Sequence, residues 1–399
     1  MERFDYLVVG GGIAGTTAAE TIREKNFHAS IAILEAEPHT LYSKLSFPKY
    51  LNNQISRKQL FLREVSDYER KRIDFFPRTY ANKIDPERHE VFCEDGRIFS
   101  YKKLLIASGS RPDDPPEYLR TEAGVPGEGS RVLRLHSLDD ADSIKETFSA
   151  PPPRSIIVAG ETFAALELFE IFYEHDFEVH AVAKGNFFGE RMLGSKGGEI
   201  LERHLQRKRI VIHKNAEIAY AKGTEFRLSN GDKFSADFAG IATGVQRNVE
   251  AFRNLKNGKG IWTDEFFMTS VPDIYAAGDA AEFFDVISGR RRLMSDWTMA
   301  FLSGRTAALN MLDERVPFKS VTSYNIVIFG VSITSMGDTE DWEDTLEYPE
   351  ENGVPSFLRL FLKEGRLKGA IFINRFADAS KISSFIEHGS SQEEVKKAF

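Results

Sequence analysis

The feature that most constrains the fold of this chain is a turn of three glycines close to its beginning. The segment FDYLVVGGGIAGTTAAETIREKN passes from a short apolar run into the turn and then into a helix-favouring stretch. A second apolar run follows and ends at Glu35, twenty residues after the last of these glycines. The glycines have the spacing GxGxxG and stand at Gly10, Gly12 and Gly15. Strand, turn, helix, strand and acid in this order predict a Rossmann module that binds a dinucleotide.

Each of these residues has a physical task in such a module. Gly10 permits the tight turn, and Gly12 lets the backbone approach a pyrophosphate. Gly15 lets the helix, which opens at Ala14, pack close to the strand. The helix N-terminus offers free N–H groups and a partial positive charge to the phosphates. Because the carboxylate of Glu35 can accept both hydroxyls of a ribose that lacks a 2′-phosphate, the module is expected to bind FAD or NAD rather than NADP.

A second, altered copy of the pattern follows the proline-rich break at residues 149–154, which cannot lie inside a helix or a central strand. Its glycine positions are occupied by Gly160, Thr162 and Ala165. Ala165 is tolerable where only close packing is needed. Thr162 is less suitable, because its β-branched side chain stands where the backbone must approach a phosphate, although its hydroxyl offers a donor.

The acid position of this second copy is also changed. Ala183 stands at the end of its second strand and is followed by Lys184. Without the acid, NADH loses its usual ribose partner, whereas a lysine suits a 2′-phosphate. If the site works, we expect it to bind NADPH rather than NADH, through Gly160, Thr162 and Lys184. The alternative is a module that keeps the fold and no longer binds a nicotinamide.

Composition excludes several other classes of function. The net charge is −8, from 52 Lys and Arg against 60 Asp and Glu, which argues against a general nucleic-acid binder with its basic face. The single cysteine, Cys93, excludes an internal disulfide, a cysteine-ligated zinc site and a protein-held iron–sulfur cluster, and we expect no metal site. Because no apolar run reaches membrane-spanning length and no signal segment is evident, we expect a cytoplasmic protein that binds no membrane.

The tandem modules and several later strings resemble the FAD-dependent pyridine nucleotide-disulfide oxidoreductase superfamily over essentially the whole chain. The similarity is to its cysteine-free branch of rubredoxin reductases, dioxygenase ferredoxin reductases and the flavin part of assimilatory nitrite reductases. The strings are IASGSRP at 106–112, GERML around Arg191, DIYAAGDAAEF at 273–283 and YNIVIFGVSITSMGD at 324–338.

The resemblance implies an α/β fold with two tandem Rossmann-like dinucleotide-binding domains and a C-terminal α+β interface domain. The implied domains are a discontinuous FAD-binding domain at 1–112 and 241–320, an NAD(P)-binding-like domain at 113–240 and an interface domain at 321–399. By the same resemblance, Asp279 holds the ribityl and pyrophosphate region of the flavin. Further implied cofactor contacts are Ala36, Lys44, Ala81, Ala107, Ser108 and Gly109.

The resemblance also implies how the flavin exchanges electrons. Disulfide reductases carry a redox cysteine pair after the first acid, but residues 39–51 contain no cysteine, and Cys93 is expected to be a small buried residue. Lys49 matches a lysine that pairs with a glutamate, here Glu167, beside flavin N5, where a positive charge stabilises reduced flavin. Trp297 matches an aromatic residue beside the flavin. Ordinary surface charges and a core tryptophan are the alternatives.

These expectations define an FAD-dependent oxidoreductase that passes electrons from NAD(P)H to a small carrier protein such as rubredoxin or ferredoxin. We expect a monomer or homodimer that binds no nucleic acid. Arg290, Arg291 and Arg292 are expected on an exposed loop, where they would attract an acidic carrier. Two alternatives stay open. One is a flavoprotein subunit of a larger electron-transfer complex with a degenerate nicotinamide site, and the other is a non-catalytic flavin-bearing interaction protein similar in design to apoptosis-inducing factor.

Overall fold

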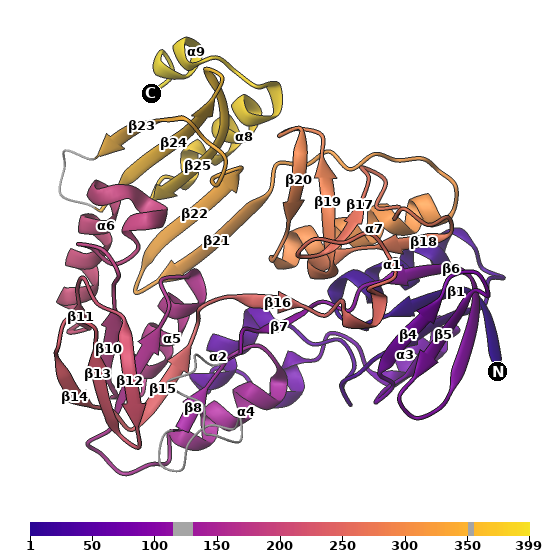
Figure 1. Cartoon of the computed structure of the whole chain (residues 1–399), viewed down its shortest axis with the longest axis horizontal. Coiled ribbons are helices and arrows are strands. Elements are labelled where there is room, and N and C mark those ends of the chain that lie inside the picture. The colour runs from indigo at the N-terminus through magenta and orange to yellow at the C-terminus, as the bar shows by residue number, and fades with distance from the viewer. Residues whose placement is uncertain (115–130, 350–354) are drawn as a thin grey trace. The chain divides into compact units, whose positions relative to one another are not determined.

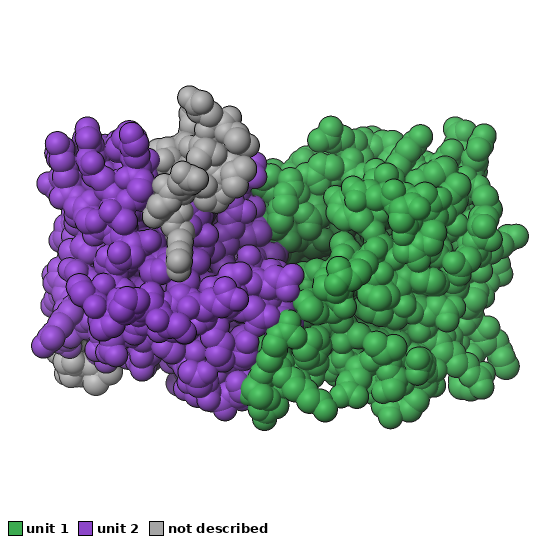
Figure 2. Space-filling view, turned by 90° about the horizontal axis from the view of Figure 1, so that it is seen from below, with its two compact units in different colours: residues 1–45, 56–111, 246–323 green, residues 46–55, 112–245, 324–399 purple. Residues whose placement is uncertain are grey.

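The computed structural model of the chain describes residues 1–114, 131–349 and 355–399 (Figure 1). The chain divides into two compact units, each built from segments that are distant in sequence (Figure 2). The first unit comprises residues 1–45, 56–111 and 246–323. The second unit comprises residues 46–55, 112–245 and 324–399.

The first unit is built on a seven-stranded sheet in the order β3-β2-β1-β6-β5-β4, with β18 paired to β6. Its strands are β1 (Glu2–Val9), β2 (Ile31–Leu34), β3 (Ile73–Phe76), β4 (Ala81–Asp85), β5 (Glu90–Cys93), β6 (Ile98–Ile106) and β18 (Ile274–Ala276). The pairs β1–β2, β2–β3, β1–β6 and β6–β18 are parallel, whereas β5 pairs antiparallel with β4 and β6. Every residue of β2 is buried, as expected for a strand covered on both faces.

Two helices of the first unit pack closely against each other. They are α1 (Ile13–Lys25) and α7 (Trp297–Met311). At their contact a Cβ on Gly304 would lie 2.2 Å from the carbonyl oxygen of Ala14, so only glycine permits this approach. The remaining elements of the unit are α3 (Val65–Arg70), β17 (Ile261–Thr263), β19 (Ala281–Asp285), β20 (Arg290–Leu293) and the short turns η2 (Arg57–Leu60), η4 (Glu250–Phe252) and η5 (Gly278–Ala280). The turn η1 spans Lys44–Ser46.

The expectation of an exposed arginine loop at residues 290–292 is wrong. These residues form β20, which pairs antiparallel with β19, and their exposure is intermediate. Arg292 Nη1 lies 3.1 Å from Asp285 Oδ2, and the Arg291 guanidinium stacks over the Trp262 ring and donates to the Thr263 carbonyl at 2.5 Å. Arg291 and Arg292 are therefore engaged within the unit.

The second unit contains a five-stranded parallel sheet in the order β11-β10-β9-β15-β8. The strands are β8 (Arg131–Leu133), β9 (Ser155–Ala159), β10 (Glu178–Val182), β11 (Val211–His213) and β15 (Phe238–Ile241). The helices α2 (Phe47–Leu51), α4 (Leu138–Thr147), α5 (Phe163–Glu174) and α6 (Glu190–Arg207) belong to the same unit. An antiparallel meander adds β12 (Ile218–Lys222), β13 (Glu225–Leu228) and β14 (Lys233–Ser235). The short strands β7 (Ser110–Pro112) and β16 (Val245–Arg247) pair with each other.

The C-terminal segment forms a separate five-stranded sheet in the order β21-β22-β25-β24-β23. Its elements are β21 (Ser323–Ile328), β22 (Val331–Gly337), β23 (Asp344–Pro349), β24 (Phe357–Lys363), β25 (Arg366–Ile373), η6 (Phe376–Asp378), α8 (Ala379–His388) and α9 (Gln392–Lys396). Strand β25 is antiparallel to β22 and β24. On α6, a Cβ at Gly197 would lie 2.7 Å from the Phe357 ring, so this helix packs tightly on the sheet.

These sheets confirm the expected fold class, with one mixed and one parallel Rossmann-like sheet and a C-terminal α+β segment. The three expected domain boundaries stay a prediction, because the two compact units group the chain differently and residues 115–130 lie outside the described residues. In the part of the chain that the structure describes, no helix combines the length and the apolar composition needed to cross a membrane.

A buried arginine joins α1 to the chain around α3. Arg23 is only 8% exposed, and its guanidinium donates five hydrogen bonds of 2.7 to 3.1 Å to backbone carbonyls. The acceptors belong to Asn26, Phe27, Ala29, Lys71 and Arg72. A buried cation is tolerated here because every arm of the fork meets an acceptor.

We predict that Arg23→Met lowers the free energy of unfolding of the first unit by about 3 kcal/mol or more, since it leaves buried carbonyls without their donor. Urea unfolding followed by intrinsic fluorescence measures the change. Arg70→Met is the matched control, because Arg70 is exposed and pairs with Asp67 at the surface. We expect a loss below about 1 kcal/mol for the control. Equal losses in both variants would contradict the role of Arg23.

Candidate functional site

The first glycine turn leaves an open cradle at the N-terminus of α1. A Cβ on Gly10, which has φ +105°, would lie 2.2 Å from the Ala107 carbonyl oxygen, and one on Gly15 would lie 1.9 Å from that of Gly10. By contrast, a Cβ on Gly12 would meet no protein atom within 4 Å. Gly12 is the N-cap of α1, with no side-chain hydrogen bond capping the helix and no acid in the first turn. The helix N–H groups therefore face a space that suits a phosphate.

Glu35 closes this cradle from the end of β2. Its Oε2 accepts a 2.5 Å hydrogen bond from the Gly11 N–H, and its Oε1 accepts one of 2.8 Å from the Glu37 N–H. Burial raises the pKa of Glu35, while these two hydrogen bonds and the positive charge of Lys44 act in the opposite direction. The carboxylate thus lies beside the turn, with Ala36 exposed next to it, as ribose recognition requires.

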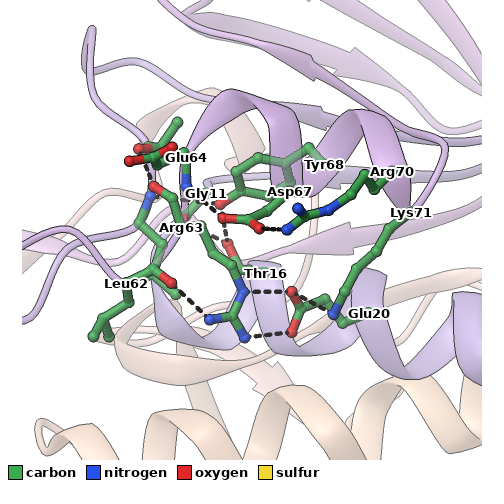
Figure 3. A network of polar contacts seen from close by, with 12 residues as sticks. Gly11, Thr16, Glu20, Leu62, Arg63, Glu64, Asp67, Tyr68, Arg70 and Lys71 are labelled. Carbon is green, nitrogen blue, oxygen red and sulfur yellow. Dashed lines mark hydrogen bonds and ion pairs between the residues drawn. The ribbon is translucent and has the colours of Figure 1, made fainter.

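A polar network holds the start of α1 in place (Figure 3). Thr16 Oγ1 donates to the Gly11 carbonyl at 2.9 Å and lies 3.2 Å from the hydroxyl of buried Tyr68. One turn further along, the Glu20 carboxylate accepts hydrogen bonds of 2.7 and 2.9 Å from Arg63, and Lys71 Nζ lies 2.9 Å from it. The sequence alone does not indicate this network, because Arg63 and Lys71 come from a segment more than forty residues away from Glu20.

The segment after β6 runs alongside the same turn. The Ala107 N–H donates to the Val9 carbonyl at 2.8 Å. Ser108 Oγ donates to the Asn248 carbonyl at 2.7 Å, and Asn248 Nδ2 donates to the Ser108 carbonyl at 3.0 Å. Gly109 has φ +70° and its carbonyl accepts from the Asn248 N–H at 3.0 Å. Asn248 therefore fixes the path of Ser108 and Gly109, while Ala107 is held by β1.

Asp279 lies in η5 and is held by two partners. Ser110 Oγ donates to Asp279 Oδ2 at 2.6 Å, and Arg247 Nη1 lies 3.3 Å from the same oxygen. Arg247 is buried and also donates from Nη2 to Ser295 Oγ at 2.6 Å. Sequence analysis missed Arg247, although an arginine in the ATGVQRN segment that returns the chain to the first unit was a usable signal.

The expected contact Ala81 is placed less directly. It is buried at the start of β4, where it pairs with Cys93, and lies two residues after Thr79, whose N–H donates to the Glu35 carbonyl at 2.8 Å.

Burial, with a smaller contribution from Asp95, raises the pKa of Cys93 to about 11, so its thiolate is scarce at neutral pH. Among the described residues, no group of three His, Cys, Asp or Glu side chains could hold a metal ion.

The second glycine turn repeats the geometry of the first with one difference. A Cβ on Gly160 would lie 2.1 Å from the Ala242 carbonyl oxygen. Thr162 caps α5, because its Oγ1 accepts from the Ala165 N–H at 3.3 Å and donates to the Ala242 carbonyl at 2.8 Å. The N-terminus of α5 is therefore partly satisfied by its own chain, unlike that of α1. Lys184 pairs with Glu217.

Lys49 and Glu167 both belong to the second unit. The exposed Lys49 lies on α2, which is anchored by the 2.7 Å hydrogen bond from Tyr50 Oη to Asp142 Oδ1. Burial and the nearby charge of Glu170 raise the pKa of Glu167, on α5, to about 7. Within the described residues no ion pair joins Lys49 to Glu167, so their pairing stays a prediction.

Trp297 is the first residue of α7 and is half-buried. The preceding residue, Asp296, caps this helix by accepting a 2.8 Å hydrogen bond from the Met299 N–H. Burial is the main cause that raises the pKa of Asp296 to about 6. The structure thus fixes the backbone at Trp297. The expectation that the Trp297 side chain lies beside the flavin stays a prediction.

Comparison with known families matches nearly the whole chain. Residues 4–304 match the family described as pyridine nucleotide-disulphide oxidoreductase, and residues 324–390 match the rubredoxin NAD+ reductase C-terminal domain. The NADH-rubredoxin oxidoreductase of Clostridium acetobutylicum is 24% identical, with 99% of this chain and 97% of the relative covered. Apoptosis-inducing factor 3 of Homo sapiens is 24% identical over 96% of this chain, and the NAD(P)H nitrite reductase of Bacillus subtilis is 23% identical over 100%. The chain spans only 63% and 49% of the lengths of these last two relatives.

Solved structures show the same fold. A chain of the covalent putidaredoxin reductase–putidaredoxin complex superimposes with a TM-score of 0.88 at 20% identity, covering 98% of this chain and 94% of that chain. The ferredoxin reductase for the CYP199A2 system from Rhodopseudomonas palustris gives a TM-score of 0.85 at 22% identity, with 99% of both chains covered. At these identities the likeness concerns the fold alone.

Two of the three glycines of the first turn, Gly12 and Gly15, give a matched pair of variants. We predict that Gly12→Val lowers the affinity for FAD by at least about 100-fold, because its side chain fills the space offered to the pyrophosphate, while the FAD-free protein keeps its fold. Gly15→Val, whose Cβ would clash with the Gly10 carbonyl, is expected to unfold the FAD-free protein as well. FAD titration by fluorescence and thermal unfolding measure both effects. If Gly12→Val binds FAD as tightly as the wild type, the open space at Gly12 is not where the pyrophosphate binds.

The raised pKa of Glu167 predicts a pH-dependent stability. Because the pKa is about 7 in the folded protein against 4.5 for an ordinary glutamate, the folded state binds the proton more tightly. The stability that protonated Glu167 contributes is fully present at low pH and is lost as pH rises through about 7. We therefore expect the stability gain of Glu167→Gln over the wild type to grow between pH 5 and pH 8, measured by denaturant unfolding. Glu174→Gln, at an exposed site on the same helix, should show no such trend.

Proposed function

Because the chain belongs to the pyridine nucleotide-disulphide oxidoreductase family, we propose that it carries electrons from NAD(P)H through FAD to a small electron-carrier protein. The family implies FAD and NAD(P)H as cofactors and an oxidoreductase activity. The observation that carries the proposal is the open cradle at Gly12 with the Glu35 carboxylate beside it, which fits the ADP half of FAD.

The carrier protein is proposed from the C-terminal segment and from the relatives. Residues 324–390 match a domain named for rubredoxin reductases, and relatives and related structures are named for rubredoxin, ferredoxin and putidaredoxin. FAD supports such a reaction because, when bound, it takes two electrons from a nicotinamide and releases them one at a time.

The residues of the chain have separate roles in this proposal. Glu35 and the N-terminus of α1 bind the ADP half, and Asp279, held by Ser110 and Arg247, orients the ribityl region. Lys49 and Glu167 supply a charge pair to the flavin ring, and Trp297 shields it. The only cysteine, Cys93, is buried with a raised pKa, so no thiol takes part.

A flavoprotein subunit of a larger complex is the second candidate, favoured by Thr162 capping α5 and by Ala183 at the acid position. A flavin-bearing interaction protein is a third candidate, favoured by the similarity to apoptosis-inducing factor 3. The preference for NADPH suggested by Ala183 and Lys184, the cytoplasmic location, and the choice between monomer and homodimer also stay predictions.

Anaerobic mixing of the yellow holoprotein with NADH or NADPH tests the proposal. We expect rapid bleaching of the flavin band, followed by its return when oxidised rubredoxin or ferredoxin is added, with two carriers reduced per FAD. Bleaching that requires a partner protein would support the subunit instead. Slow bleaching with a long-lived charge-transfer band would support the interaction protein, and a colourless protein that refuses FAD would exclude all three.

A further inference from the structure

The second module contains a carboxylate that the usual dinucleotide pattern does not have. Glu161 stands inside the glycine turn, between Gly160 and Thr162. Its Oε2 accepts a 3.2 Å hydrogen bond from the Lys184 N–H, and its Oε1 accepts one of 3.0 Å from the Gly189 N–H. The side chain therefore spans from the turn to the loop that follows β10.

Strand register relates this carboxylate to Glu35 of the first module. Val8, two residues before Gly10, pairs with Ile33, which lies two residues before Glu35. Likewise Val158, two residues before Gly160, pairs with Ala181, which lies two residues before Ala183. Ala183 thus occupies the structural position of Glu35, and Glu161 occupies that of Gly11.

In both modules a glutamate side chain connects the glycine turn to the end of the second strand, but the glutamate comes from opposite ends of this connection. In the first, Glu35 reaches from the strand end to the Gly11 N–H of the turn. In the second, Glu161 reaches from the turn to the Lys184 N–H beyond the strand end. A Cβ placed on Gly11 would lie 2.9 Å from Glu35 Oε2. A side chain at the Gly11 position, which Glu161 holds in the second module, therefore begins close to the place that the Glu35 carboxylate occupies in the first. Glu161 therefore places a carboxylate between the turn and the strand end of the second module, where Ala183 offers none.

The charges around this loop disfavour a 2′-phosphate. The Lys184 ammonium is drawn to Glu217. A second carboxylate, that of Glu190, accepts from the Asn186 N–H at 2.9 Å and would lie 2.5 Å from a Cβ on Gly185. Glu161 and Glu190 thus flank the loop with negative charge, and a phosphate dianion placed there would be repelled. Arg191, exposed in the first turn of α6 directly after this loop, is the cation that a 2′-phosphate would use instead.

We propose that Glu161 recognises the adenosine ribose of the nicotinamide cofactor and makes the second module prefer NADH over NADPH. This inference rests on the proposed function, since it assumes that the second module binds a nicotinamide. It predicts the opposite cofactor preference to that suggested by Ala183 and Lys184 in the sequence. The carboxylate accepts the 2′- and 3′-hydroxyls, and its charge excludes the 2′-phosphate.

The test measures binding of ADP-ribose and of its 2′-phosphate to the FAD-loaded protein by calorimetry. We expect the wild type to bind ADP-ribose at least about tenfold more tightly, and Glu161→Gln to reduce this preference to below about threefold. Glu225→Gln, a surface acid of the same unit that pairs with Arg227, should keep the preference of the wild type. The double variant Glu161→Gly with Ala183→Glu, which restores the arrangement of the first module, should recover it.

Two results would overturn the role of Glu161 while leaving the proposed function intact. In the first, NADH reduces the flavin, but the ratio of the affinities for ADP-ribose and its 2′-phosphate in Glu161→Gln stays within twofold of the wild-type ratio. The other is a wild type that prefers the 2′-phosphate and loses this preference in Arg191→Gln. If neither nicotinamide reduces the flavin and ADP-ribose does not bind, the proposed function fails and the assignment of Glu161 fails with it.

Discussion

Close backbone contact at the first glycine turn is the constraint on which the rest of the structure depends. Gly10 and Gly15 stand where any side chain would overlap a carbonyl oxygen, so strand β1, helix α1 and the segment after β6 meet with only backbone between them. This contact aims the free N–H groups of α1 at one point and brings Ala107 beside them. A cofactor cradle follows, because an uncapped helix N-terminus and a neighbouring carboxylate are complementary to a phosphate and a ribose.

Buried and half-buried charges join the distant segments that complete the first unit. Arg23 ties α1 to the chain around α3, Glu20 binds Arg63 from that same region, and Arg247 meets Asp279 across the first unit. Each of these groups would be costly alone in the interior, and each is compensated by a partner or by backbone carbonyls. The same principle applies to β20, where Arg292 meets the buried Asp285.

The two modules share the geometry of the glycine turn but differ in the residues around it. The close contact of Gly160 with Ala242 repeats that of Gly10 with Ala107, so the second turn keeps its shape. The residues that differ between the two modules lie at positions where close backbone packing does not require glycine. Thr162 satisfies part of its own helix end, and a carboxylate has moved from the strand to the turn at Glu161. Cofactor choice can therefore change by substitutions that leave the packing of the sheet untouched.

The sequence by itself determined the two Rossmann modules and the position of Glu35, because apolar period, glycine spacing and the distance to an acid are local properties of the chain. The C-terminal α+β segment was expected only from the resemblance to a known family. The sequence could not determine that Arg247 meets Asp279, that residues 290–292 pair as a strand, or that Glu161 reaches the Lys184 N–H. These contacts join residues brought together only by strand register and tertiary packing, and a side chain's partner depends on which distant segment lies within hydrogen-bonding reach.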